Sequence, residues 1–408
     1  EAPTLARARC PPRGRSVASD GRAPLTMDAA RLAWLPAAET ARLIAGGAIS
    51  AEDHVRACLA QIGQTEPTVQ AWEHLDPDSA LEQAREADDH RRRGLPCGPL
   101  HGVAIGIKDI IDVRGLPTGD GSVLHAGRIA RRDATVVGRL RAAGAVILGK
   151  TVTTEMATYA PGRTRNPHDP EHTPGGSSSG SAAAVAAGMV PVALGSQTNG
   201  SIIRPASYCG VYGFKPSFGL VPRGGVLTLS RALDHVGVLA RSLEDLALVT
   251  ECIAGFAEDD ADTMPPRVRP PLSAVLAQEP PLPPKLALVR TPFWDRLDAD
   301  ARATFDELAQ ALGDRADAVE LPPEIAEAVD WHRTVFEADL TLEAGKDYSV
   351  IAAGELAAGG IQPVVLDDTA RRKELYEALL YALQNYEDPW NAAVQKPAVR
   401  REYEKLEA

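Results

Sequence analysis

Segments with strand-like and helix-like spacing alternate along this 408-residue chain, and this alternation constrains its fold more than any other feature. The run Val103–Ile107 is typical of a short strand, whereas Thr135–Ala143 has helical spacing and ends at Gly144, a residue favoured just after a helix. Such alternation favours one large α/β domain with a mixed, mainly parallel sheet covered by helices on both faces. Helices are predicted at 38–45, 51–62, 76–92, 135–143, 181–188, 242–253 and 300–312, and strands at 103–107, 145–148, 190–194, 211–214, 286–289 and 316–321.

Charge and cysteine usage argue against several classes of protein. A formal net charge of −12 argues against a nucleic-acid-binding surface, which needs a basic face. The five cysteines are scattered and not in Cys-x-x-Cys pairs, which argues against a disulfide framework or a zinc site and favours a reducing compartment, here taken as the cytoplasm. No apolar run reaches the roughly 18 residues of a membrane span, so no membrane association is expected.

Two segments rich in glycine and serine carry the strongest functional signal. They read Gly-Gly-Ser-Ser-Ser-Gly-Ser at 175–181 and Gly-Ser-Gln-Thr-Asn-Gly-Ser at 195–201. Because glycine lets main-chain N–H groups approach a ligand closely, a serine there is a candidate nucleophile with an oxyanion hole of neighbouring amides. Lys108 is a candidate base. Taken singly, the segment at 175–181 is more simply explained as a linker, Ser201 as a helix N-cap and Lys108 as a solvent-exposed lysine. Their occurrence together favours a catalytic site.

Three further motifs match functional patterns by letter only. Residues 144–151 match a phosphate-binding loop, but their inner residues are themselves the predicted strand. His168 and His172 have the spacing of a zinc hydrolase, but Pro170 between them would break the required helix. Ser178 sits in a Gly-x-Ser-x-Gly motif without a strand running into it. We therefore assign no function to these three motifs.

Together the glycine and serine segments and their flanking residues resemble the amidase signature family. The matching text is Gly-Val-Ala-Ile-Gly-Ile-Lys-Asp at 102–109, Gly-Leu-Pro-Thr at 115–118, Gly-Ser at 121–122, the two segments above, Arg-Pro-Ala at 204–206 and Cys-Gly-Val-Tyr-Gly-Phe-Lys-Pro at 209–216. This combination is far more specific than a single glycine-rich motif.

The resemblance implies a Ser–cis-Ser–Lys triad. Ser201 is then the nucleophile, Ser177 the bridging serine after a cis peptide bond from Gly176, and Lys108 the base. Burial disfavours the ammonium and lowers the pKa of a lysine from its usual value of about 10.4, so a buried Lys108 is suited to accept a proton from Ser177.

The resemblance also implies the oxyanion hole and the supporting residues. The hole is expected at the main-chain N–H groups of Thr198, Asn199, Gly200 and Ser201. Supporting or substrate-binding roles are expected at Met156, Gly176, Ser178, Gln197 and Arg204, and other residues of 154–161 are also expected to line the pocket. The chain departs from the family pattern at Ser179 and Asn199, which replace glycines, and at Gln197, which replaces a frequent aspartate; asparagine tolerates left-handed backbone better than most residues.

The resemblance is strong over about 28–250 and looser over 251–350, which predicts one domain at 27–408. Its signature core is expected at about 95–255, followed by a surface excursion at 265–284, where eight of twenty residues are proline. The strand-rich C-terminal segment of the family is not recognised, so 350–408 is expected to be atypical. Residues 1–26, with five arginines and four prolines, are expected to be a disordered or extraneous tail.

The resemblance to the amidase signature family implies a serine amidohydrolase that forms an acyl-enzyme on Ser201. We expect it to act alone, on amides and also on anilides, carbamates or esters. It is expected to be a monomer or homodimer with a small-molecule substrate and no metal or organic cofactor. Three alternatives remain. They are the glutaminase subunit of a tRNA-dependent amidotransferase, a catalytically degenerate binding scaffold, and a Ser–His–Asp triad using His101 or His235.

Overall fold

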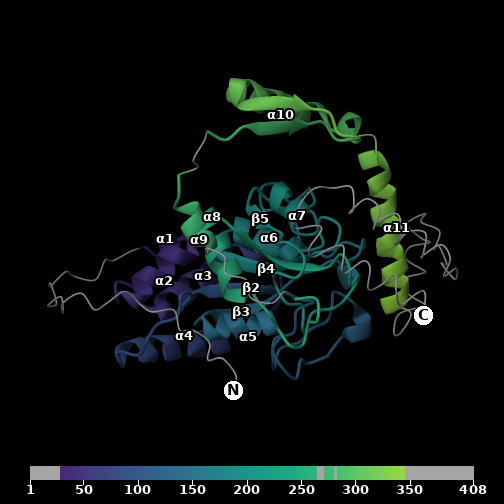
Figure 1. Cartoon of the computed structure of the whole chain (residues 1–408). Coiled ribbons are helices and arrows are strands. Elements are labelled where there is room, and N and C mark those ends of the chain that lie inside the picture. Colours follow the sequence, from purple (N-terminus) through teal and green to yellow (C-terminus); the bar gives the residue numbers. More distant parts are fainter. Residues whose placement is uncertain (1–27, 264–270, 280–282, 323, 345–408) are drawn as a thin grey trace, which may run out of the picture.

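The computed structural model describes residues 28–263, 271–279, 283–322 and 324–344 (Figure 1). Predictions about 1–26 and 350–408 lie outside these residues, as does part of the proline-rich stretch at 265–284. The described part contains no helix both long and apolar enough to span a bilayer.

A six-stranded mixed sheet forms the centre of the molecule, with strand order β1-β3-β2-β4-β6-β5. The pairs β2–β3 and β2–β4 are parallel, whereas β1–β3, β4–β6 and β5–β6 are antiparallel. Four strands (β2, β3, β4 and β5) therefore run in one direction, as expected for a mainly parallel sheet. The strands are β1 (Trp72–Leu75), β2 (Ala104–Lys108), β3 (Val146–Thr151), β4 (Val192–Gln197), β5 (Tyr212–Phe214) and β6 (His235–Ala240).

Helices cover both faces of the sheet, because neighbouring residues of its central strands point to opposite sides. Ala104 and Ala193 belong to one hydrophobic cluster, whereas Ile105 and Val192 belong to the other. Residues of α1 (Ala29–Ala33), α3 (Ala51–Val69), α4 (Pro77–Arg92), α6 (Ser179–Ala186) and α7 (Ile203–Tyr208) contribute to the first cluster. Residues of α5 (Thr135–Ala142), α8 (Leu243–Ile253), α11 (Glu324–Ala344) and part of α2 (Ala37–Ala45) contribute to the second. The predicted fold class is confirmed.

Most predicted elements appear within a few residues of their expected bounds. The clearest correction is α3, expected to end near Ile62, which continues through Pro67 to Val69. It ends where Gln70 adopts a left-handed φ of 52° and the Glu66 carboxylate accepts the N–H groups of Ala71 and Trp72. Five elements packed in the body of the molecule were not predicted: α1, β1, α7, β6 and α11.

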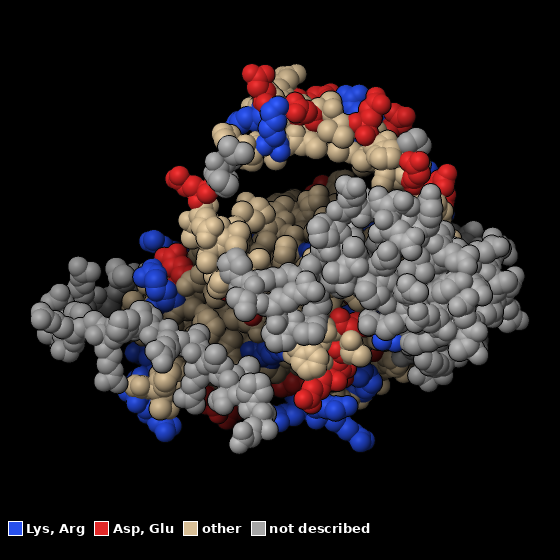
Figure 2. Space-filling view, viewed as in Figure 1, with Lys and Arg blue, Asp and Glu red and all other residues tan. Residues whose placement is uncertain are grey.

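A smaller unit lies apart from the main sheet (Figure 1). The parallel strands β7 (Leu286–Val289) and β8 (Ala316–Val319) are joined by α10 (Ala299–Leu312). The sequence predicts these three elements, but as a continuation of the main sheet; the structure instead pairs β7 and β8 in a sheet of their own. A short helix, α9 (Leu272–Leu276), precedes it, and the single-turn helices are η1 (Val123–His125), η2 (Glu155–Ala157), η3 (Trp294–Arg296) and η4 (Gly313–Arg315). Figure 2 shows open space between this unit and the body, and both acidic and basic side chains on it.

Candidate active site

Lys108 is the last residue of β2, at the centre of the sheet, and its side chain is fully buried. Its Nζ is hydrogen-bonded to Oγ of Ser177 at 2.7 Å and to Oγ of Ser196 at 2.8 Å. Ser196 lies on the neighbouring strand β4, which pairs in parallel with β2. The sheet therefore aims a buried amine at two hydroxyl groups.

The surroundings of Lys108 favour its neutral form. Burial lowers its pKa well below the usual value, because removal from water disfavours the ammonium. The negative charge of Asp234 opposes this decrease, and the positive charge of Arg204 reinforces it. A lysine with such a pKa is a suitable proton acceptor.

Ser177 lies in the loop before α6, and the peptide bond from Gly176 to Ser177 is cis, as the resemblance implies. Nε of Arg204, on α7, donates to the carbonyl of Gly176 at 3.0 Å. Oγ of Ser178 donates to the carbonyl of Ser196 at 3.1 Å. The loop is thus attached to α7 on one side and to β4 on the other.

Ser201 follows β4 and is buried beside the same loop, where its carbonyl accepts the N–H of Ser178 at 3.2 Å. Among the residues that the structure describes, no hydrogen bond joins Oγ of Ser201 to Oγ of Ser177. Within the same residues, the N–H groups of Asn199, Gly200 and Ser201 donate to no protein acceptor. Such N–H groups are available to a ligand oxygen, which is the requirement for an oxyanion hole.

The oxyanion segment, which we define as residues 198–201, is held by Asp234 in the loop before β6. Oγ1 of Thr198 donates to Oδ1 of Asp234 at 2.6 Å, and the N–H groups of Leu229 and Ser230 donate to Oδ2 at 2.7 and 3.0 Å. Burial raises the pKa of Asp234 to about 6, and the hydrogen bond from Thr198 opposes that increase. Asp234 therefore connects the oxyanion segment with the electrostatic environment of Lys108.

Two of the expected supporting residues, Gln197 and Met156, form hydrogen bonds with main-chain groups of the loops around the site. Oε1 of Gln197 accepts the N–H groups of Ile202 and Ile203 at 2.9 and 3.0 Å, at the start of α7. Met156 has a left-handed φ of 47°, and its N–H donates to the carbonyl of Asp120 at 2.8 Å. These contacts account for Gln197 and Met156 as residues that shape the loops around the site.

The sequence analysis did not name three residues next to the site: Ser196, Asp234 and His332. Ser196 lies inside a quoted motif, so its position was a usable signal. Nε2 of His332, on α11, lies 3.1 Å from the carbonyl oxygen of Thr198. Burial raises the pKa of Tyr159, whose side-chain hydrogen bond with Asn199 opposes the increase. No local pattern marks Asp234 or His332, because their partner Thr198 lies 36 and 134 positions away in the sequence.

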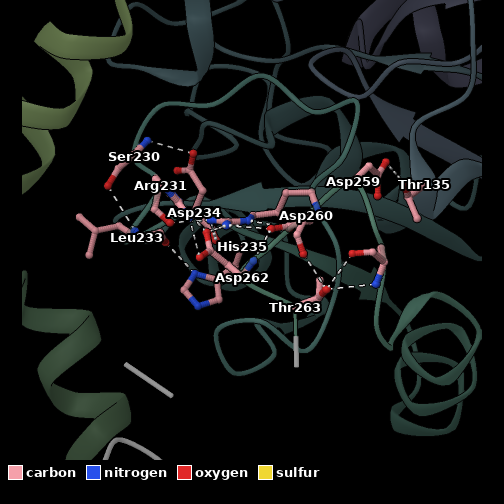
Figure 3. Close-up of polar contacts among 12 residues, drawn as sticks. Thr135, Ser230, Arg231, Leu233, Asp234, His235, Asp259, Asp260, Asp262 and Thr263 are labelled. Atoms are coloured by element: carbon pink, nitrogen blue, oxygen red, sulfur yellow. Dashed lines mark hydrogen bonds and ion pairs between the residues drawn. The ribbon is translucent and has the colours of Figure 1, made fainter. Parts of the chain in front are cut away.

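A cavity of about 450 Å³ adjoins the site. Its lining includes Ser196 and Asp234, together with the ion-paired Arg223, Arg231 and Asp262. Figure 3 shows Arg231, Asp234 and Asp262 close together on this side of the molecule. The cavity therefore has a polar lining next to a hydrogen-bond partner of Lys108.

The structure supports rejecting two of the three motifs, the phosphate-binding loop and the zinc-hydrolase pattern. Residues 146–151 form β3, and Lys150 is buried with Nζ 2.9 Å from Oδ1 of Asp109. Nε2 of His168 is bonded to the carbonyl of Cys209, and Nδ1 of His172 to Asp169. The described residues contain no cluster of three or more His, Cys, Asp or Glu side chains suited to a metal ion.

The histidines of the alternative triad are engaged elsewhere. Nε2 of His101 is bonded to the carbonyl of Ala87, and Nδ1 of His235 to that of Leu233. Burial lowers the pKa of His235 to about 3. Neither ring forms a hydrogen bond with Ser177, Ser178 or Ser201 in the described part of the chain.

Comparison with known proteins identifies one family and several relatives. The family model described as Amidase matches residues 53–407. The glutamyl-tRNA(Gln) amidotransferase A subunit of Chloroflexus aurantiacus is 46% identical over 228 residues, which are 54% of this chain and 47% of that protein. The corresponding protein of Salinibacter ruber is 40% identical over 68% of this chain and 55% of its own length. The match thus spans about half the length of these curated relatives.

Solved structures match a larger share of the chain. The native peptide amidase of Stenotrophomonas maltophilia is 31% identical with a TM-score of 0.68, covering 91% of this chain and 79% of its own. The glutamyl-tRNA(Gln) amidotransferase A subunit of Thermotoga maritima is 28% identical with a TM-score of 0.65, covering 87% and 78%.

Proposed function

The chain belongs to the amidase signature family, and we propose that it hydrolyses amide C–N bonds through an acyl-enzyme formed on Ser201. The observation that carries this proposal is the 2.7 Å hydrogen bond between the buried amine of Lys108 and the hydroxyl of Ser177. The pKa of this amine is lowered, and its partner Ser177 lies in the loop that is hydrogen-bonded to the main chain of Ser201; both observations support the role of a base.

The proposed reaction proceeds in two steps. Neutral Lys108 accepts the proton of Ser177, which accepts that of Ser201, while Oγ of Ser201 forms a bond to the carbonyl carbon. The free N–H groups of the oxyanion segment stabilise the negative oxygen. The proton returns through Ser177 to the leaving nitrogen, the C–N bond breaks, and an ester on Ser201 remains. Water then gives a proton to the same acceptors and attacks the carbonyl carbon of this ester. The bond to Oγ of Ser201 breaks, the proton returns through Ser177 to Oγ, and the carboxylic acid is released.

Two candidate substrates differ in whether a protein partner is required. The curated relatives favour glutamine as the amide donor, with this chain as the glutaminase subunit of a tRNA-dependent amidotransferase. The structural match to a peptide amidase favours a chain that acts alone on amides, with carbamates and esters as related substrates. Gln197, which stands where the family often has an aspartate, does not discriminate between these candidates, because its side chain accepts main-chain N–H groups at the start of α7.

We expect a fluorophosphonate, which reacts with activated serine nucleophiles, to modify Ser201 once per chain. Peptide mass spectrometry locates the adduct. Ser201→Ala should abolish both labelling and hydrolysis, with a loss of at least about 10³-fold. Ser207→Ala is a matched control, because Ser207 is an exposed serine on α7. Labelling of another serine, or none, would favour the degenerate scaffold.

Ammonia release separates the two candidates. The chain alone, and the chain with the partner proteins of an amidotransferase, are each assayed on L-glutamine and on a panel of primary and peptide amides. Partner-dependent glutamine hydrolysis supports the glutaminase of an amidotransferase, whereas hydrolysis of the panel by the chain alone supports the independent amidase.

A further inference from the structure

Helix α11 packs against the oxyanion segment although it lies more than 120 residues further along the chain. Phe336 and Leu340 on this helix are buried in the second hydrophobic cluster. The Phe336 ring also contacts Tyr159 in a T-shaped arrangement, with ring centroids 6.1 Å apart. One side of α11 is therefore anchored to the body of the molecule, next to the site.

Polar contacts join the same helix to the oxyanion segment at two points. Nε2 of His332 lies 3.1 Å from the carbonyl oxygen of Thr198, and because a carbonyl only accepts, the imidazole is the donor. About two turns further along α11, Asp339 accepts the hydroxyl of Ser230 at 2.5 Å. The N–H of Ser230 in turn donates to Asp234, which accepts Oγ1 of Thr198. Hydrogen bonds thus form a closed path from α11 through Thr198 and Asp234 back to α11.

His332 donates to the peptide group that joins Thr198 to Asn199. The carbonyl of Thr198 and the N–H of Asn199 belong to the same planar group, and in a trans peptide they point in opposite directions. A donor that fixes the carbonyl toward α11 therefore fixes the N–H away from α11. That N–H is one of the groups without a protein acceptor among the described residues. A hydrogen bond accepted by the carbonyl also polarises the peptide and strengthens its N–H as a donor.

We infer that His332 is a positioning residue, which holds the peptide between Thr198 and Asn199 so that the Asn199 N–H faces the reacting carbonyl oxygen. The inference rests on the proposed function, since it assigns this N–H to the oxyanion of the acyl transfer. Because the oxyanion forms only after attack by Ser201, the contact should affect kcat more than KM.

The test replaces the donor while keeping the volume of the side chain. We expect His332→Leu to lower kcat about 10- to 100-fold and to change KM by less than about threefold. This decrease in kcat is no larger than the roughly 10²- to 10³-fold decrease that follows removal of one oxyanion-hole donor. His332→Gln, whose side-chain amide can donate at a similar reach, should recover most of kcat. Glu327→Gln, at an exposed position of α11, should have no effect. A thermal unfolding curve for each variant separates these effects from loss of the fold.

The amide ¹⁵N resonance of Asn199 gives a second readout that needs no activity. It should move in His332→Leu and return toward its original position in His332→Gln. If the wild-type chain neither hydrolyses amides nor reacts with a fluorophosphonate, the proposed function fails, while this resonance still tests the contact. Unchanged kcat in His332→Leu, or equal losses in both His332 variants, would overturn the inference.

Discussion

Lys108 is affected by two charges of opposite sign from different parts of the chain. Asp234, before β6, raises its pKa, and Arg204, on α7, lowers it, while burial makes the largest contribution and lowers it. Activity in the proposed reaction should fall at acidic pH, as Lys108 becomes protonated and can no longer accept the proton of Ser177. The pH of this decrease therefore reports the protonation of Lys108 together with that of its neighbour Asp234, whose pKa burial raises to about 6.

Replacing Asp234 and replacing Arg204 should shift the acidic limb of the pH profile, the pH range in which activity falls, in opposite directions. Asp234→Asn removes a negative charge, so the pKa of Lys108 should decrease and the limb should move to lower pH. Arg204→Gln removes a positive charge, so the limb should move to higher pH. Profiles of kcat/KM against pH for the wild type and both variants test this expectation. Shifts in the same direction would show that Lys108 is not the group that titrates.

At the scale of the elements, the end of β2 is tied to β3 by a buried ion pair. Lys150 on β3 and Asp109, directly after Lys108, are both essentially inaccessible to solvent, and Nζ and Oδ1 lie 2.9 Å apart. Nζ of Lys150 also donates to Oγ1 of Thr118 at 2.8 Å, and the N–H of Gly119 donates to Asp109. The pair therefore holds the loop after β2 against the strand beside it.

Breaking this pair should destabilise the fold strongly. Lys150→Met leaves the Asp109 carboxylate buried without its counter-charge, and we expect a loss of about 3–5 kcal/mol in the free energy of unfolding. Lys285→Met is the matched control, because Lys285 and Asp317 form an exposed pair and such pairs contribute no more than about 1 kcal/mol. Denaturant unfolding measures both. Similar small losses in the two variants would mean that the buried pair contributes little net stability.

At the scale of the whole molecule, the unit formed by β7, α10 and β8 buries little of its apolar surface. Leu286 on β7, Leu308 on α10 and Val319 on β8 remain 46%, 51% and 44% exposed. Few buried apolar contacts mean a low free energy of local opening. The main body, in contrast, has two buried clusters on the faces of its sheet.

Limited proteolysis should therefore distinguish the unit from the body. Among the described residues, we expect trypsin to cut first between 285 and 315, where Lys285, Arg290 and Arg302 lie, and to leave the bonds after Lys108 and Lys150 intact. Mass spectrometry of fragments over time identifies the order. Early cleavage within 100–250 would show that the body, not this unit, opens first.

The sequence alone determined the features that depend on neighbouring residues. Hydrophobic spacing and caps located most helices and strands, and the mixed sheet followed from their alternation. The motifs identified Lys108, Ser177 and Ser201 as candidates through their resemblance to the amidase signature family, which is recognisable without a structure. Their catalytic roles remain predictions.

What surrounds those candidates depends on how segments distant in the sequence pack together. Asp234 approaches Lys108 because β6 pairs with β4, and β6 was not recognised as a strand. His332 reaches Thr198 across 134 residues, from a helix that the sequence analysis did not predict. Such contacts leave no local pattern, since they depend on how α11 and β6 pack against the sheet. The sequence therefore indicates the reacting groups, whereas packing sets their charge and orientation.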